Sequence, residues 1–228
     1  MMAQAGIHAI VGAAVRRWAP GRTWLVLGIV LGSLLPDADN LAVAVTTVTK
    51  LPTEGVHRTF THSLFTVAAV IIVFNVVSII LRSSRWRNLG LGLGLGILLH
   101  ILLDLVIWFN GVAILWPLSS WINFWSVVTP PAWFEKLMLP AEFLFMGLFF
   151  AWLAAIARKQ GTDQRYSRTV SLWAWVQLAL FLVFTLLVYA MQSGFLTIYG
   201  LVYLLSLGLA IYITIRMRET LEGSRFAL

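Results

Sequence analysis

Long stretches of apolar residues dominate the chain and define its predicted elements. A helix that crosses the hydrocarbon of a membrane needs about 20 residues, because each residue advances about 1.5 Å. Two shorter apolar stretches, 3–15 and 24–35, come first. The pattern predicts an all-α fold, a polytopic transmembrane helical bundle with about five full spans and two shorter N-terminal membrane helices. The predicted full spans are residues 64–81, 89–109, 137–157, 170–191 and 195–215.

The overall composition supports this prediction. Of the 228 residues, 60% are hydrophobic and only 11% are charged, whereas soluble domains carry about 25% charged residues. So few charges could not cover a soluble globule of this size. The absence of cysteine excludes a disulfide scaffold and a zinc–thiolate site. The net charge of +7 therefore bears on orientation and on contact with membrane lipid, and we expect no nucleic-acid partner.

Basic residues occur in four clusters between the predicted helices, and these clusters contain thirteen of the sixteen Lys and Arg residues. If the clusters share one side of the membrane, every intervening span alternates in direction, and the positive-inside rule makes that side cytoplasmic. We therefore expect a multi-pass membrane protein with cytoplasmic basic loops and a cytoplasmic C-terminus. We expect residues 1–157 to form one helical membrane domain and residues 158–228 a basic loop with two further transmembrane helices. The clusters are Arg16, Arg17 and Arg22; Arg82, Arg85 and Arg87; Arg158, Lys159, Arg165 and Arg168; and Arg216, Arg218 and Arg225.

The ionisable residues within or beside the apolar stretches are the candidates for chemistry, because such groups are costly at membrane depth. All four histidines and three of the nine acids have such positions. Measured along the helices from the basic ends, each falls in the middle or outer half of the bilayer. These residues are His8, Asp37, Asp39, His57, His62, His100 and Asp104.

Their spacing leaves several interpretations open. His100 and Asp104 are four residues apart and project from one helix face, which suits two metal ligands, or one ligand and its carboxylate partner. The same spacing also suits a buried hydrogen bond between helices. Taken alone, Asp37 and Asp39 fit a Pro-Asp turn that ends a helix, and His8 fits a histidine used in helix packing.

His57 and His62 are five residues apart, so they cannot share one helix face. We expect Thr59 or Thr61 to cap the next helix, with His57 on a loop and His62 in the first turn. Ser63 lacks the surroundings of a serine nucleophile and is expected to cap or to support the site.

Considered together, the seven residues predict a metal site. Imidazole and carboxylate ligands without a thiol suit zinc, with manganese or iron as alternatives, and hydrolytic sites of this kind often hold two metals. We therefore expect one or two divalent ions.

Four alternating glycines, Gly90, Gly92, Gly94 and Gly96, might be taken for a nucleotide-binding loop. Such a loop needs a preceding strand and a further glycine at the position of Ile97. At a spacing of four, these glycines form two overlapping small-xxx-small pairs, which predict close packing between helices.

The same residues, in this order, resemble the YdjM-type family of inner-membrane proteins. The match lies in roughly the first 120 residues, and the block His-Arg-x-x-Thr-His-Ser is its most specific part. The resemblance implies a membrane-embedded, metal-dependent hydrolase, and Glu142 looks similar to an acid that the family carries after a Trp-Pro turn. The matching segments are residues 5–8, 34–39, 57–64, 99–104 and 115–117.

A fainter similarity is to zinc-dependent phospholipase C, which also orders an early His, an Asp, a His, a His-x-x-x-Asp and a later Glu on a helical frame. A further His-x-x-x-Glu of that family is missing here, because Met138 occupies the place of the histidine. A three-metal site is therefore not expected. The residues that follow this order are His8, Asp37, His62, His100, Asp104 and Glu142.

The predicted function is hydrolysis of an ester or phosphoester of an amphiphilic, lipid-like substrate by a metal-activated water. Asp39 or Glu142, if uncoordinated, would be the general base. Arg58 would pair with an anionic group such as a phosphate, or alternatively form a salt bridge to Asp37 or Asp39.

Two other classes of function fit the same residues. A metal or ion transporter also places His and Asp within the membrane, but inward of His8 and His100 the sequence offers Gly, Leu and Ala, with no acid or histidine to continue a path. A structural or regulatory module would hold the metal for stability alone. The sequence does not determine the oligomeric state.

Overall fold

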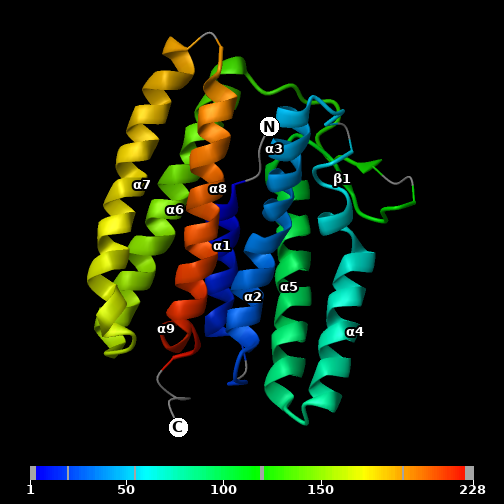
Figure 1. The fold of residues 1–228 in the computed structure, drawn as a ribbon, viewed down its shortest axis with the longest axis vertical. Helices are drawn as coiled ribbons and strands as arrows, with labels where there is room; N and C mark the ends of the chain where they lie inside the picture. Colours follow the sequence, from blue (N-terminus) through cyan, green and yellow to red (C-terminus); the bar gives the residue numbers. More distant parts are fainter. Residues whose placement is uncertain (1–3, 20, 54, 119–120, 192, 224–228) are drawn as a thin grey trace.

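The helices of the computed structural model run side by side along one common axis (Figure 1). The structure describes residues 4–19, 21–53, 55–118, 121–191 and 193–223. Two strands of two residues each pair antiparallel, with Val112 opposite Ile122, and close a small hairpin beside the bundle. In chain order the elements are α1 (Ala5–Ala14), the 3-10 helix η1 (Val15–Arg17), α2 (Leu25–Leu34), the 3-10 helix η2 (Leu35–Asp39), α3 (Asn40–Thr49), the 3-10 helix η3 (Phe60–His62), α4 (Leu64–Ile80), α5 (Ser84–Ile107), β1 (Val112–Ala113), β2 (Trp121–Ile122), α6 (Ala132–Gln160), α7 (Gln164–Ala190), α8 (Phe195–Arg216) and α9 (Arg218–Glu222).

The predicted all-α membrane bundle is confirmed, but one of the five segments that can span a membrane differs from the prediction. Within the described residues, five helical segments are long and apolar enough to cross a membrane, and four of them are α5, α6, α7 and α8. The fifth is Leu25–Thr49, where we had predicted a short helix, whereas Leu64–Ile80 is among the shorter apolar helices.

The difference arises at Pro36: α2 ends just before it, at Leu34, as predicted, but further helical turns follow without a break. Pro36 lies at the start of η2, where its missing N–H is not needed for a helical hydrogen bond. The chain therefore continues from α2 through η2 into α3. Asp37 and Asp39 consequently lie on a 3-10 turn within a continuous helical segment.

Glycines bring the backbones of α2 and α5 into contact, as the spacing predicted. A Cβ atom at Gly32 of α2 would overlap the carbonyl oxygen of Leu93, and one at Gly96 of α5 would overlap the carbonyl oxygen of Ile29. Gly90 and Gly94 instead face side chains of α4. The glycine run thus packs α5 tightly between α2 and α4.

The last two long helices complete the main apolar core with α1, α2 and α6. The ring of Phe143 on α6 lies 5.0 Å from that of Phe184 on α7 and 5.5 Å from that of Tyr199 on α8. A smaller core joins α4, α5 and β1. The division of the chain after residue 157 stays a prediction.

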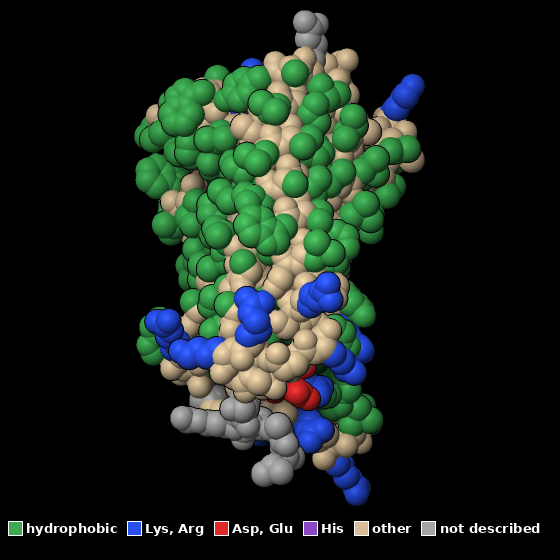
Figure 2. Space-filling model, turned by 90° about the vertical axis from the view of Figure 1, so that its left-hand side faces the viewer, with side chains coloured by type: hydrophobic (Ala, Val, Ile, Leu, Met, Phe, Trp, Pro, Cys, Tyr) green, Lys and Arg blue, Asp and Glu red, His purple; other side chains and the backbone are tan. Residues whose placement is uncertain are grey.

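The segments that carry the four basic clusters lie at one end of the bundle. These are the end of α1, the α4–α5 turn, the α6–α7 turn and the end of α8 (Figure 1). Figure 2 shows Lys and Arg side chains gathered at this end, below a broad apolar surface. Arg225, which the sequence placed in the fourth cluster, lies outside the described residues. We refer to this end as the basic end.

Candidate metal centre

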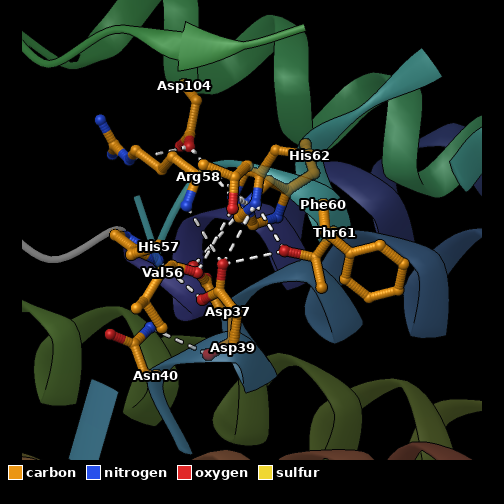
Figure 3. A network of polar contacts seen from close by, with 12 residues as sticks. Asp37, Asp39, Asn40, Val56, His57, Arg58, Phe60, Thr61, His62 and Asp104 are labelled. Atoms are coloured by element: carbon orange, nitrogen blue, oxygen red, sulfur yellow. Dashed lines mark hydrogen bonds and ion pairs between the residues drawn. The ribbon is translucent and has the colours of Figure 1, made fainter. Parts of the chain in front are cut away.

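The seven predicted ligand residues gather in one place, where η2, the 57–63 segment and α5 meet α1. Figure 3 shows the side chains of Asp37, Asp39, His62 and Asp104 pointing toward one another. Asp37, His62, His100 and Asp104 are fully buried, and His8 is 1% exposed. His57 is the most accessible of the set, with 19% of its side chain exposed.

Two overlapping groups of these residues could each hold a metal ion. One group is His8, His100 and Asp104, and the other is Asp37, His62 and His100. In each group the potential ligand atoms lie within 4.8 Å of one another. Because His100 belongs to both groups, they are neighbouring positions in one centre.

The hydrogen bonds of His100 fix which of its nitrogens carries the proton. Its Nδ1 lies 2.8 Å from the backbone oxygen of Ser33. A carbonyl oxygen can only accept, so Nδ1 donates its proton and Nε2 presents a lone pair.

His62 is oriented in the same way by Thr61 and Asp39. The Thr61 hydroxyl donates its proton to Asp39 Oδ2 over 2.8 Å and lies 2.9 Å from His62 Nδ1. With its own proton used, the hydroxyl can only accept from His62, so Nδ1 carries the ring proton and Nε2 presents a lone pair. Burial lowers the pKa of His62, which favours this neutral form.

The two lone pairs face each other, since His62 Nε2 lies 3.0 Å from His100 Nε2. Two neutral rings with these tautomers have no proton to share across this contact. The separation fits two ligands of one zinc-like ion, each at about 2.0–2.1 Å. Both carboxylate oxygens of Asp37 are also buried without a hydrogen-bond partner among the described residues, and Oδ1 lies 3.7 Å from His100 Nε2. A buried carboxylate stays ionised only when it is paired or metal-bound, and two unpaired oxygens beside two imidazole lone pairs form a donor set that fits a divalent cation.

Asp104 connects the two ligand groups. Its Oδ1 lies 3.2 Å from His8 Nε2, and its Oδ2 lies 3.5 Å from His62 Nε2. The rings of His8 and His100 are stacked with centroids 3.7 Å apart. Asp104 and His100 therefore project from one face of α5, as their spacing predicted.

Arg58 pairs with Asp104 and not with Asp37 or Asp39 through its side chain. Its Nε lies 3.3 Å from Asp104 Oδ2, and its Nη1 donates to the backbone oxygen of Asn110 over 3.0 Å. Its Nη2 is buried without a hydrogen-bond partner among the described residues. The guanidinium thus retains the two N–H donors of Nη2 for a ligand at the centre.

Asp39 supports its neighbours with both oxygens. Oδ1 lies 2.6 Å from His57 Nδ1, and Oδ2 accepts from the Arg58 backbone N–H over 3.2 Å and from Thr61. The backbone of Arg58 reaches this position in a left-handed conformation, with φ of 61°. These contacts favour Asp39 as the residue that orients His57 and His62.

Glu142 lies beside the centre and outside both ligand groups. It is fully buried on α6, its Oε1 accepts from the backbone N–H of Gly6 over 3.1 Å, and its Oε2 has no hydrogen-bond partner among the described residues. A carboxylate oxygen is thus left available beside the ligands.

Sequence reasoning missed Tyr203 of α8. Its hydroxyl is buried without a hydrogen-bond partner among the described residues, and it interacts electrostatically with Asp37 and Glu142. A tyrosine in an apolar helix belongs to no motif that would have marked it in the sequence. Through this buried residue, α8 also contributes to the surroundings of the site.

The cap of α4 differs in part from the prediction. His57 lies on a loop, but His62 belongs to the separate turn η3. Neither Thr59 nor Thr61 caps α4, because Ser63 does so by accepting from the Phe65 backbone N–H. Because of the extra turn η3, α4 begins only at Leu64, and Ser63 is its capping residue. Capping was one of the two roles expected for Ser63.

Comparison with known proteins identifies one matching family. The profile of the YdjM inner membrane protein family matches residues 1–216. The match extends beyond the first 120 residues, in which the sequence motifs lie, and includes α7 and α8. No curated protein and no solved structure matches the chain.

Proposed function

The chain belongs to the YdjM inner membrane protein family, and we propose that its buried centre is the active site of a metal-dependent hydrolase. The proposed substrate is an ester or phosphoester of an amphiphilic, lipid-like molecule. One observation carries the proposal: the Nε2 lone pairs of His62 and His100 face each other across 3.0 Å, beside a carboxylate of Asp37 that has no hydrogen-bond partner among the described residues.

His62, His100, Asp37 and Asp104 would hold the first ion, and His8 would join His100 and Asp104 if a second ion binds. Nitrogen and carboxylate donors without sulfur favour zinc, with manganese or iron as alternatives. A bound divalent ion supplies Lewis acidity, which polarises the scissile group and makes water acidic enough to act as a nucleophile near neutral pH.

The chain's own residues would orient the substrate and move protons. The Nη2 of Arg58, which has no hydrogen-bond partner in the described part of the chain, would donate to an anionic oxygen such as that of a phosphate. Glu142, whose Oε2 has no hydrogen-bond partner within the described chain, would accept a proton as general base. Asp39 would hold His57 and His62 in position, because both of its oxygens are already engaged.

The proposed orientation places the basic end in the cytoplasm and the centre in the outer half of the bilayer. A buried centre between membrane helices is reached most directly by a molecule that itself partitions into lipid. His57 offers an entry side, since it lines an open groove of about 540 Å³ together with Asn40, Glu135 and Lys136.

The test is turnover of phosphatidylglycerol and phosphatidic acid by purified protein, followed by mass spectrometry of the products. His100→Ala should abolish chelator-sensitive turnover. Ser206→Ala, which removes a buried hydroxyl from the hydrogen bond with Gln177, should retain it. Unchanged turnover in His100→Ala would overturn the proposal. Metal uptake into proteoliposomes without hydrolysis would favour the transporter alternative.

A further inference from the structure

A second groove lies at the basic end, away from the metal centre. It encloses about 550 Å³ between the end of α1 and the end of α6. Three cations line it, Arg16 and Arg17 from η1 and Lys159 from the last turn of α6. We call it the basic groove.

The cations of the basic groove have no counter-ion among the described residues. None of the described residues that line the groove is acidic. Within the part of the chain that the structure describes, Arg16, Arg17 and Lys159 make no ion pair. Arg16 is partly buried, and this burial lowers the pKa of its guanidinium. Arg17 and Lys159 are exposed. Three cations without an acidic partner, one of them partly desolvated, favour binding of an anion.

Apart from Gln160, the remaining walls of the groove are apolar. Ile10 of α1 and Trp152 and Ile156 of α6 line it on the side toward the middle of the bundle. Trp18, whose side chain is 77% exposed, also lines it at the basic end. Indole rings prefer the membrane–water interface, so the groove combines a cationic mouth with an apolar wall at the level where a lipid headgroup meets its acyl chains.

We propose that the basic groove binds an anionic phospholipid of the surrounding membrane. Its phosphate would lie among Arg16, Arg17 and Lys159, and an acyl chain would lie along Ile10 and Ile156. Basic pockets between membrane helices are suited to such headgroups. The apolar wall distinguishes this ligand from free phosphate, which would use only the cations.

The position of the groove gives the lipid a structural role. Arg16 and Arg17 follow α1, which carries His8, whereas Lys159 ends α6, which carries Glu142. The two helices already touch closely, because a Cβ atom at Gly6 would overlap the backbone of Met146. A phosphate bound to both helix ends would hold α1 against α6. The binding proposal does not rest on the hydrolase activity.

The experiment is native mass spectrometry of the purified full chain in detergent, titrated with phosphatidylglycerol, phosphatidylcholine or inorganic phosphate. The wild type should retain phosphatidylglycerol in preference to phosphatidylcholine. The triple variant R16Q/R17Q/K159Q should bind phosphatidylglycerol about tenfold more weakly or worse, because each cation near a lipid surface contributes to affinity. The matched control R82Q/R87Q/R168Q removes the same charge at the same end but outside the groove, and should bind as the wild type does.

Ala14→Phe gives a second measurement that leaves every charge in place. Ala14 is an exposed residue that lines the groove, so a phenyl ring there would occupy the acyl-chain space and weaken phosphatidylglycerol binding. Wild-type binding in either Ala14→Phe or the folded triple variant would overturn the proposal. Equal retention of phosphatidylcholine, or displacement of lipid by millimolar inorganic phosphate, would also overturn it.

Discussion

His62 and His100 point unprotonated nitrogens at each other across 3.0 Å, because each ring gives its only proton to a partner on its other side. His100 donates to the Ser33 carbonyl, and His62 donates to Thr61. The contact is unfavourable between two neutral rings and favourable around a cation, so the stability of the protein should depend on a bound metal.

Removing the metal should therefore lower the melting temperature. A ligand at 100 times its Kd stabilises a fold by about 2.7 kcal/mol, and about 1 kcal/mol shifts the Tm of a chain of this size by roughly 2–4 °C. We expect EDTA to lower the Tm in detergent by about 5–10 °C and added zinc to restore it. The His100→Ala variant should not respond to either treatment. A wild-type Tm that is insensitive to chelation would contradict the proposed metal.

Metal content should depend on Asp104. This residue lies close to both His8 and His62, so its loss affects both ligand groups. Elemental analysis should find one or two zinc-like ions per wild-type chain and a marked loss in Asp104→Ala. Asp163 is the one aspartate of the sequence outside the cluster, and Asp163→Ala should keep the wild-type content. Equal content in the two variants would place the metal elsewhere.

Thr61→Val should lower the affinity for the metal without removing any ligand. The hydroxyl connects Asp39 with His62 Nδ1, and loss of such a supporting contact costs about 10–100-fold in metal affinity. Zinc affinity measured by competition with a chromogenic chelator tests this expectation. Thr47→Val is the matched control, because the Thr47 hydroxyl binds only its own helix, at the Val43 carbonyl oxygen.

Gly32→Ala should destabilise the protein. The added Cβ would overlap the Leu93 carbonyl oxygen, and such overpacking costs about 1–3 kcal/mol. The control is Gly208→Ala on α8, where a Cβ would meet nothing within 4 Å and where alanine favours the helix by roughly 0.5–1 kcal/mol. Thermal unfolding of both variants should therefore give shifts of opposite sign. A neutral Gly32→Ala would show that the two helices can separate at little cost.

The stability should contain a pH-dependent contribution from Glu222 at the basic end. Burial raises the pKa of this carboxyl from 4.5 to about 7. Between these values the folded state holds a proton that the unfolded state has released, so this contribution to stability falls as the pH rises from about 4.5 to about 7. Glu222→Gln should remove it, and the Tm of the variant relative to wild type should rise between pH 5 and pH 8. Glu219→Gln, on the same helix, should follow the wild-type pH dependence.

The sequence predicted those features that depend on local pattern. The glycine run of α5 pointed to close helix packing, and the scarcity of ionisable residues pointed to the cluster around His100. The continuation of the helix through Pro36 could not be read locally, because proline is compatible both with a helix end and with a first turn. The same holds for Arg58, whose spacing allowed a pair with Asp37 or Asp39 but gave no reason to favour Asp104.

The contacts that orient the site residues also could not be predicted from the sequence. The Ser33 carbonyl lies 67 residues from His100, and every residue has such a carbonyl, so no residue type marks it. Tyr203 was missed for a related reason, since only packing of α8 against η2 brings it to Asp37.

The glycine contact between α2 and α5 bears on which ion the proposed centre would accept. Asp37 follows α2 and His100 lies on α5, and no compressible side chains separate the two backbones at Gly32 and Gly96. The two helices therefore cannot move closer together to bring these two ligands nearer to a small ion. The choice between small and large cations would then depend on the packing of α2 against α5, and not only on the ligand atoms themselves.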